Sequence, residues 1–493
     1  MGESFSGRVR SALFWRSGSQ ILSQLVMWAS TLFVIRILDP QDYGLFAMTQ
    51  VILVLLNFLN GYGFASSLIQ SESLDENRIR QAFGMLLLLN GGLAILQIAT
   101  APFVADYYRQ DEIADLLRVQ ALLYCATPFI ALPDALLSRA LDFRNQAKAN
   151  LAAAVAGAAT ALGCALAGLG VWTLVFAPIA LFYTRAICLT LATRLLVWPS
   201  FDFRGARAMF GFGGALLASN LMWVIQNQAD IFIGGRTLNP HALGLYAEAL
   251  FLTQIFASKF VPPLNEVAFP AYSRLQNDAE AFARSFAKAI RLIMLVALPV
   301  YFGLAVTARP AVLVLFGPKW VEIVPLVEIL AFAIPFMTLH VLFAPALNAK
   351  GQPGVTARLS AAGAIIMTIA FLAGVRFGAV GLAYAWLFGM PVAALVATAL
   401  ALPVIGVRWI DLGKAILPGL AAAAAMAAIV RGVDALLPPL SPLPQLALLV
   451  TAGGLSYVAL LFILARATFE ELLRLVIRRK PPMAEGASAL QAP

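Results

Sequence analysis

Long apolar runs fill most of this sequence and constrain its fold more than any other feature. Runs of about 20 residues with few charged side chains recur throughout the chain, and each is long enough to cross the hydrocarbon core of a bilayer. Of the 493 residues, 61% are hydrophobic and 12% are charged, and the mean hydropathy is +0.85. Soluble domains carry about twice that charged fraction. Because the runs are continuous rather than alternating, they predict an all-α polytopic membrane protein and not a transmembrane barrel.

The apolar runs predict about fourteen transmembrane helices. Two pairs of neighbouring runs are separated only by short turns that contain glycine, and each pair is expected to form a hairpin (147–168 with 171–194, and 354–375 with 379–402). The expected spans are 11–37, 43–69, 81–104, 113–138, 147–168, 171–194, 208–234, 242–270, 287–307, 321–347, 354–375, 379–402, 412–436 and 443–465.

The distribution of cations predicts the orientation of these helices. With the N-terminus in the cytoplasm, 23 Lys and Arg residues fall on the cytoplasmic side of the fourteen spans and 6 on the opposite side. This bias follows the positive-inside rule. It predicts a multi-pass protein of the cell inner membrane with both termini in the cytoplasm. The same bias accounts for the net charge of +9, so no nucleic-acid partner is expected.

A short stretch occurs twice, at residues 36–47 and 236–247. Proline cannot continue a preceding helix, so Asp39 and Asn239 are expected as N-caps with Pro40 and Pro240 at the first helical positions. A glycine one turn later allows helices to approach closely in a bilayer. The identical pairs at this offset are Arg36/Arg236, Leu38/Leu238, Pro40/Pro240, Gly44/Gly244, Leu45/Leu245 and Ala47/Ala247.

The doubled stretch divides the chain into two related halves. Six predicted helices separate the two copies, so both copies face the same, non-cytoplasmic side and the halves are parallel repeats. The stretch is therefore interpreted as a signature of the fold and its symmetry, and not as the cargo site. The expected units are an N-terminal six-helix lobe (1–200), a C-terminal six-helix lobe (205–405), two additional helices (406–467), and a cytoplasmic amphipathic segment with a disordered tail (468–493).

Three stretches in this order resemble the polysaccharide/oligosaccharide flippase branch of the multidrug/oligosaccharidyl-lipid/polysaccharide exporter superfamily. They are Leu38–Phe46, Leu137–Arg144, and Gln228–Arg236 with the residues that follow it as far as Arg274. The resemblance covers roughly residues 10–410. It implies two six-helix lobes around a central cavity that opens alternately to each side of the membrane.

The resemblance also implies the cargo and the partners. The cargo would be an oligosaccharide repeat unit linked to undecaprenyl pyrophosphate, carried across the inner membrane for the synthesis of a surface polysaccharide such as O-antigen, capsule or exopolysaccharide. Membrane lipids, a polysaccharide polymerase with chain-length machinery, and a coupling ion are further partners of such a transporter. No cofactor is expected.

Two cations are candidates for contact with the pyrophosphate. Lys259 is near the middle of its predicted span, where a lysine is costly without a purpose. Its alternative role is a structural ion pair with Glu248 or Glu266. Arg16 is near the cytoplasmic end of the first span, and its alternative role is that of a snorkelling residue. Lipid II flippases of the superfamily use cations on their first helices and on helix 8, and the scarcity of arginine on the first two spans here argues against lipid II as cargo.

Amides and carboxylates inside the spans are candidates for contact with the sugars. Asn220, Asn227 and Asp230 are spaced to share one face of a helix. Asn57 and Asn60 form a smaller pair. Glu248 completes the set of substrate-binding candidates. Hydrogen bonding between helices is the alternative role for the face that contains Asp230 and for the pair of asparagines. Arg185 and Glu328 are further intramembrane charges, without an identified partner.

Other classes of function find less support in the sequence. Only two histidines occur, without the company of a catalytic triad or a metal site, and no phosphate-binding loop is present. The longest expected outer loop (308–320) is short for a membrane glycosyltransferase, so no enzyme is predicted. A cation-coupled antiporter of the same superfamily remains an alternative, although the spans 11–37 and 43–69 contain no acidic residue.

Overall fold

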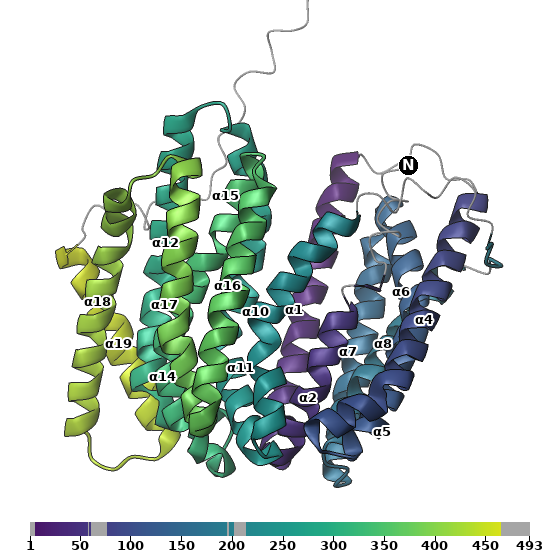
Figure 1. Cartoon of the computed structure of the whole chain (residues 1–493), viewed down its shortest axis with the longest axis horizontal. Helices are drawn as coiled ribbons and strands as arrows, with labels where there is room; N and C mark the ends of the chain where they lie inside the picture. The colour runs from purple at the N-terminus through teal and green to yellow at the C-terminus, as the bar shows by residue number, and fades with distance from the viewer. Residues whose placement is uncertain (1–4, 58, 61–75, 195–196, 202–212, 465–493) are drawn as a thin grey trace, which may run out of the picture.

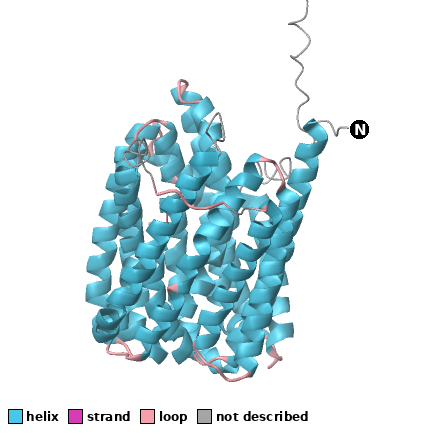
Figure 2. Ribbon diagram, turned by 90° about the vertical axis from the view of Figure 1, so that its right-hand side faces the viewer, coloured by secondary structure: helices cyan, strands magenta, loops and turns pink. Residues whose placement is uncertain are grey.

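A computed structural model describes residues 5–57, 59–60, 76–194, 197–201 and 213–464, with the side chains of 5–17 and 213–220 excluded. Nearly all of the described chain is helical, and no strand occurs in it (Figure 2). The structure therefore confirms the predicted all-α class.

Seven described helices make up the first half of the chain. They are α1 (Phe5–Ile37), α2 (Pro40–Asn57), α4 (Glu76–Tyr108), α5 (Glu112–Gln120), α6 (Leu122–Arg139), α7 (Phe143–Leu166) and α8 (Trp172–Thr193).

The second half contains ten further α-helices and two short 3₁₀ segments. They are α10 (Gly213–Thr237), α11 (Pro240–Arg274), α12 (Ala279–Val306), α13 (Ala308–Leu315), η1 (Pro318–Ile323), α14 (Val324–Val341), α15 (Phe343–Ala349), α16 (Pro353–Gly374), η2 (Val375–Phe377), α17 (Gly378–Ile405), α18 (Trp409–Leu436) and α19 (Pro442–Leu464).

Each of the fourteen predicted spans overlaps described helix, and residues 61–69 and 208–212 of two of these spans lie outside the described residues. The span predicted at 113–138 is divided between α5 and α6, and the span at 321–347 between η1, α14 and α15. Ten helical stretches of the described chain are long and apolar enough to cross a membrane, and one of them, Pro353–Ile405, holds both helices of a hairpin. α2, α10 and α11 are not among the ten.

Glycines form both predicted hairpins. In the turn between α7 and α8, Gly168 and Gly170 have positive φ values of 74° and 51°. Residues other than glycine rarely adopt this backbone conformation. Between α16 and α17, a Cβ atom on Gly381 would lie 2.0 Å from the carbonyl oxygen of Gly374. The two helices can approach this closely only because both positions lack a side chain.

The helices form two lobes that lie side by side (Figure 1). The helices α1, α2 and α4–α8 pack together in one lobe and α10–α17 in the other, while α18 and α19 pack on the outside of α12. We propose the sequence-based bounds, 1–200 and 205–405, for these lobes. The amphipathic segment and tail expected at 468–493 lie outside the described residues.

The two ends of the molecule differ in how the lobes meet. The turn end carries the doubled stretch and the turns at 109–111 and 167–171, and the lobes are in contact there. The basic end carries the turns at 140–142, 350–352 and 406–408. In Figure 1 the turn end is below, and the two groups of helices diverge toward the basic end.

Candidate functional site

The two copies of the doubled stretch touch each other at the turn end. Helices α2 and α11 cross where Gly44 faces Gly244. A Cβ atom built on Gly44 would lie 1.8 Å from the carbonyl oxygen of Pro240, and one built on Gly244 would lie 1.8 Å from that of Pro40. The stretch is thus more than a signature of the fold, because its glycines form a reciprocal contact between the lobes.

The predicted N-caps differ between the two copies. The Asn239 side chain accepts a hydrogen bond from the backbone N–H of Ala242 at 2.8 Å, as predicted for an N-cap. The Asp39 side chain instead pairs with Lys319 of the other lobe at 2.9 Å. The Asp42 carboxylate, at the third helical position of α2, accepts a hydrogen bond from the Asp39 N–H at 3.0 Å. This bond stabilises the start of the helix. Asp39 therefore holds the predicted N-cap position before Pro40, but its side chain does not make the capping bond.

The paired arginines of the doubled stretch bind the opposite lobe. The Arg36 guanidinium, at the end of α1, donates to the carbonyl oxygens of Val314 and Leu315 at the end of α13, with Nε 3.3 Å from the Leu315 oxygen. The last carbonyls of a helix lack partners within the helix and carry partial negative charge. A guanidinium, which presents several donors in a fixed fork, matches two successive carbonyls.

Arg236 makes the equivalent contact in the other direction. At the end of α10, its guanidinium donates to the carbonyl oxygens of Asp106 and Tyr107 at the end of α4, at 3.1 Å from the Asp106 oxygen. Sequence analysis gave no role to either arginine. The available signal was their identity in both copies, whereas the neighbouring polar residues differ.

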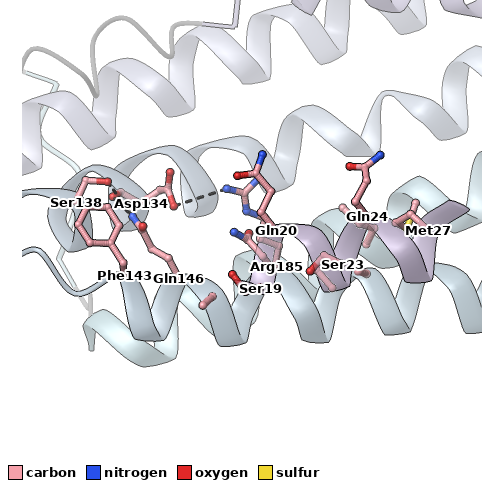
Figure 3. A pocket seen from close by; sticks show the side chains of 15 residues that line it. Ser19, Gln20, Ser23, Gln24, Met27, Asp134, Ser138, Phe143, Gln146 and Arg185 are labelled. Atoms are coloured by element: carbon pink, nitrogen blue, oxygen red, sulfur yellow. Dashed lines mark hydrogen bonds and ion pairs between the residues drawn. The ribbon is translucent and has the colours of Figure 1, made fainter. Parts of the chain in front are cut away.

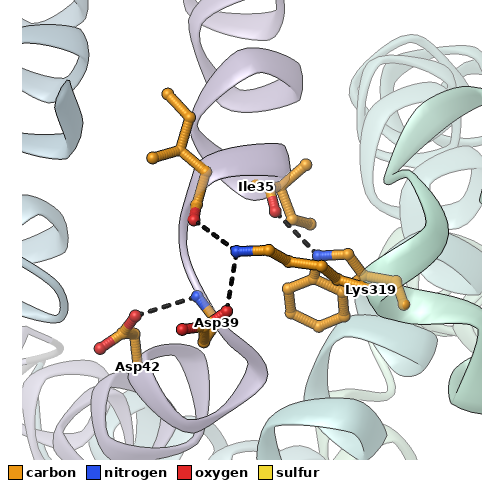
Figure 4. A network of polar contacts seen from close by, with 6 residues as sticks. Ile35, Asp39, Asp42 and Lys319 are labelled. Carbon is orange, nitrogen blue, oxygen red and sulfur yellow. Dashed lines mark hydrogen bonds and ion pairs between the residues drawn. The ribbon is translucent and has the colours of Figure 1, made fainter. Parts of the chain in front are cut away.

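Further polar contacts join the end of α1 and the start of α2 to η1 of the other lobe (Figure 4). The indole Nε1 of Trp320, which is fully buried, donates to the carbonyl oxygen of Ile35 at 2.8 Å, and its ring meets the ring of Tyr43 edge-on at 5.4 Å. The Tyr107 ring stacks on Phe232 of α10 at 4.6 Å. The exposed Lys319–Asp39 ion pair adds little, on the order of 0–1 kcal/mol. Buried aromatic and backbone contacts therefore dominate the closure of the turn end.

One face of α11 continues from this contact into the molecule. Glu248 and Lys259 follow Gly244 at intervals close to whole helical turns, which places them near the face of α11 that meets the N-terminal lobe, and Glu266 follows after Pro262 and Pro263. Glu248 is half-buried, while Lys259 and Glu266 are exposed. In the described part of the chain, Lys259 forms no ion pair with either glutamate. The alternative role expected for Lys259 is therefore absent from this conformation.

The polar face predicted on α10 points away from the other lobe. Phe232 and Arg236 contact the N-terminal lobe, and Asn227 and Asp230 lie on the opposite side of the helix. The Asn227 amide donates to the Trp223 carbonyl oxygen of its own helix at 2.9 Å. This placement favours the interhelical alternative over sugar contact for Asp230.

The carboxylate of Asp230 is completely buried in the C-terminal lobe. It accepts hydrogen bonds from the Tyr246 hydroxyl at 2.6 Å, from the Trp386 indole at 3.1 Å and from the Ile231 N–H at 2.8 Å. These bonds join α10, α11 and α17. Gln228 is half-buried and lies one turn before Phe232, so its amide is on the face of α10 toward the N-terminal lobe.

We expect Asp230→Ala to lower the unfolding temperature of the detergent-solubilised protein. The substitution leaves the buried Tyr246 hydroxyl without its acceptor and opens a cavity, while the Trp386 indole keeps its 2.7 Å hydrogen bond to the Tyr246 oxygen. Each lost bond costs about 1 kcal/mol. Asp230→Asn retains one acceptor oxygen and should have a smaller effect. The measurement is thermal unfolding of both variants, and an unchanged transition in Asp230→Ala would contradict the structural role.

The remaining sequence candidates are placed as follows. The Asn60 side chain, which is buried, donates to Asn57 at 2.6 Å, and Asn57 is exposed and lines a cavity of about 230 Å³ in the N-terminal lobe. Arg16 and Asn220 lie in α1 and α10, but their side chains are outside the described part of the structure.

A larger polar cavity of about 400 Å³ lies between α1, α6, α7 and α8 (Figure 3). Arg185 finds a partner there, because its guanidinium is 3.6 Å from the Asp134 carboxylate. Sequence analysis missed this site, since its residues come from four separated helices. The polar side chains that line the cavity are Ser19, Gln20, Ser23, Gln24, Asp134, Ser138, Gln146, Asn150 and Arg185.

The C-terminal lobe has an apolar cavity instead. It encloses about 850 Å³ between α11, α12, α18 and α19, so the two additional helices form part of its wall. Its lining is almost entirely aliphatic and aromatic and includes Phe256, Phe260, Leu295, Val300, Leu449 and Leu461.

A profile of the family described as "Polysaccharide biosynthesis protein" matches residues 33–325, which is more than half of the chain. The chain belongs to this family. Among curated relatives of this family member, the teichuronic acid biosynthesis protein TuaB of Bacillus subtilis is 24% identical over 341 residues, covering 66% of this chain and 68% of the relative. The succinoglycan biosynthesis transport protein ExoT of Rhizobium meliloti is 25% identical over 345 residues, covering 70% and 69%.

The fold of this family member is also found in a solved transporter structure. The lipid II flippase MurJ, in an inward closed conformation, superposes with a TM-score of 0.70 at 12% identity, covering 93% of this chain and 99% of that one. The comparison confirms the predicted fold, with two six-helix lobes followed by additional helices. The profile match confirms the resemblance predicted from the three sequence stretches.

Proposed function

We propose that this protein flips oligosaccharide repeat units linked to undecaprenyl pyrophosphate across the cell inner membrane for the synthesis of a surface polysaccharide. The family assignment supports a role in polysaccharide biosynthesis, and ExoT is named as a transport protein. The observation that carries the proposal is the difference between the lobes, one with a polar cavity and the other with an apolar cavity.

This difference matches the chemistry of a lipid-linked saccharide. The sugar residues need hydrogen-bonding partners and have to avoid hydrocarbon, whereas the polyprenyl chain gains about 0.8 kcal/mol for each CH₂ group kept out of water. A transporter that moves both parts together therefore needs polar and apolar surfaces at the same depth in the bilayer. Translocation requires no bond to be made or broken in the cargo, so we assign no catalytic role.

The closed turn end fits one state of an alternating-access cycle. We infer from the cation distribution that this end faces away from the cytoplasm and that both termini are cytoplasmic. Export then requires the contacts of Arg36, Arg236 and the paired glycines to break and to form again in each cycle. A coupling ion and contacts with a polymerase and its chain-length machinery complete this proposal.

We propose Lys259 as a cation that meets the pyrophosphate, with Arg16 near the entrance. Lys259→Ala should reduce surface polysaccharide severely, because the phosphates would lose a cation in a region of low dielectric constant. Lys259→Arg should retain most of the export, and Lys414→Ala, which removes an exposed lysine of α18, is the matched control. The measurement is surface polysaccharide in a deletion strain that expresses each variant at equal level. Normal export by Lys259→Ala would exclude this role.

Deletion of the gene tests the function as a whole. The expected result is loss of surface polysaccharide together with accumulation of a lipid-linked saccharide in the cytoplasmic leaflet, identified by mass spectrometry of extracted lipids. Loss of polysaccharide without any accumulated lipid-linked saccharide would contradict a flippase.

A further inference from the structure

The polar cavity of the N-terminal lobe has the size and composition of a ligand site. Its volume of about 400 Å³ lies within the range of small-molecule pockets, about 300–1,000 Å³. It lies in a lobe that crosses the membrane, where polar groups are costly unless they have partners. The packing of α7 on α8 does not require these polar groups, because small residues already bring the two helices together. Gly157 of α7, for example, contacts Leu181 of α8.

The equivalent helices of the C-terminal lobe have bulky side chains buried at their contacts. By order along the repeat, α10, α16 and α17 correspond to α1, α7 and α8. Trp386 and Met367 are fully buried between them, and the Gln226 amide packs directly against Gly363. In the described part of the C-terminal lobe, bulky side chains thus occupy the contacts between these helices, while in the N-terminal lobe a cavity lined by polar groups lies between α1, α7 and α8.

The lining presents hydrogen-bonding groups that suit sugar hydroxyls. A hydroxyl donates one bond and accepts others, so a sugar ring is best met by planar groups that offer both functions. Asp134 contributes a carboxylate, Arg185 a guanidinium, and Gln24 and Asn150 amides. The Nε of Arg185 is shielded from solvent and has no hydrogen-bond partner in the described structure. The Nη2 atom of Arg185 lies 3.6 Å from the Asp134 carboxylate, which makes an ion pair without a short hydrogen bond.

Gln146 holds the wall of the cavity in position. Its amide donates to the backbone carbonyl of Asp134 at 2.9 Å and to the Ser138 hydroxyl at 2.8 Å, which ties α7 to α6 beside the ion pair. Figure 3 shows the Arg185–Asp134 pair together with the polar side chains of α1. Because α1 supplies one wall and α8 supplies Arg185, the lining is complete within a single lobe.

We propose that this cavity is a saccharide-binding subsite that holds one sugar residue of the cargo between Arg185, Asp134 and the amides of α1 and α7. The proposal rests on the proposed function and deepens it. It assigns recognition of the sugar to the N-terminal lobe, away from Asn227 and Asp230 of α10. Arg185 and Asp134 bind the sugar hydroxyls directly, and Gln146 is a positioning residue.

Protection from a thiol reagent tests the subsite. Gln24→Cys, in a chain whose three native cysteines are replaced by serine, places a thiol in the cavity, and Ser273→Cys places one at a half-buried position outside it. Inverted membrane vesicles are prepared from cells that make the lipid-linked saccharide and from cells that lack the transferase for its first sugar. The probe is N-ethylmaleimide. We expect labelling of Gln24→Cys to be severalfold slower in the first vesicles and labelling of Ser273→Cys to be the same in both.

A second substitution separates binding from folding. Arg185→Gln in the Gln24→Cys chain should abolish the protection while the labelling rate in vesicles without cargo stays unchanged. Equal labelling of Gln24→Cys in both vesicles, while the same chain restores surface polysaccharide to a deletion strain, would overturn the subsite and leave the proposed function intact. Failure of the wild-type chain to restore polysaccharide would instead count against the proposed function.

Discussion

Gly44→Ala and Gly244→Ala are each expected to abolish export of surface polysaccharide. The new methyl carbon would lie 1.8 Å from a backbone oxygen of the opposite lobe, where real Cβ atoms essentially never approach within 3.0 Å. The obstacle is backbone, which cannot swing aside like the end of a flexible side chain, so α2 and α11 have to separate. Either substitution should therefore favour the state that is open at the turn end.

The matched control for these substitutions is Gly92→Ala. Gly92 is also inside a helix, and a Cβ atom there would meet nothing within 4 Å. Alanine is favoured over glycine in a helix by about 1 kcal/mol, equally at both sites. Gly92→Ala should therefore export normally, and a Gly44→Ala variant that exports as well as Gly92→Ala would refute the close contact.

An independent measurement reports the state of the turn end. Met48 is fully buried beside the crossing and close to Gly235 of the other lobe. Met48→Cys in a chain without native cysteines should react slowly with a membrane-impermeant maleimide added from outside the cell. Gly44→Ala should accelerate this reaction strongly, since it holds the lobes apart.

The number and placement of the helices were predictable because each depends on a local property. A run of about 20 apolar residues has to form a helix in hydrocarbon whatever its neighbours are. The same locality explains the correct prediction of Asn239 as an N-cap and of both glycine hairpins. The division of one span between α5 and α6 was missed, because the apolar run is continuous across the junction at Ala121.

The candidate site was less predictable because its contacts join distant parts of the chain. Helical spacing correctly indicated that Asn227 and Asp230 share a face, but it does not say which neighbour that face meets. The partners of Asp230 are Tyr246 and Trp386, on two other helices. The partner of Arg185 could likewise not be predicted from the sequence, because only the fold brings Asp134 of α6 close to it.

The doubled stretch shows what repetition can and cannot indicate. Repetition identified Gly44, Gly244, Arg36 and Arg236 as conserved between the halves of one chain. It did not indicate that each residue contacts the opposite lobe, because Arg36 and its acceptor Leu315 are 279 positions apart. Their role follows only when the two lobes are seen together.

Arg36→Gln and Arg236→Gln are expected to weaken the closed turn end without obstructing it. Hydrogen bonds to a charged group contribute about 1.5–3 kcal/mol, so each loss should shift the balance between closed and open states about 10- to 100-fold. Lysine should rescue poorly, because its single ammonium group cannot reproduce the fork that spans two successive carbonyls. We therefore expect faster outside labelling of Met48→Cys in both glutamine variants, and a further increase when the two are combined.

Arg376→Ala distinguishes this effect from a general loss of positive charge at the turn end. Arg376 is exposed in η2, at the same end of the molecule. Its removal changes the net charge by the same amount as Arg36→Gln and should leave the labelling rate of Met48→Cys unchanged. If all three variants accelerate labelling equally, the arginines act through the surface potential. If only Arg36→Gln and Arg236→Gln do so, the two reciprocal contacts hold the lobes together, and the repeat is retained because each half of the chain closes on the other.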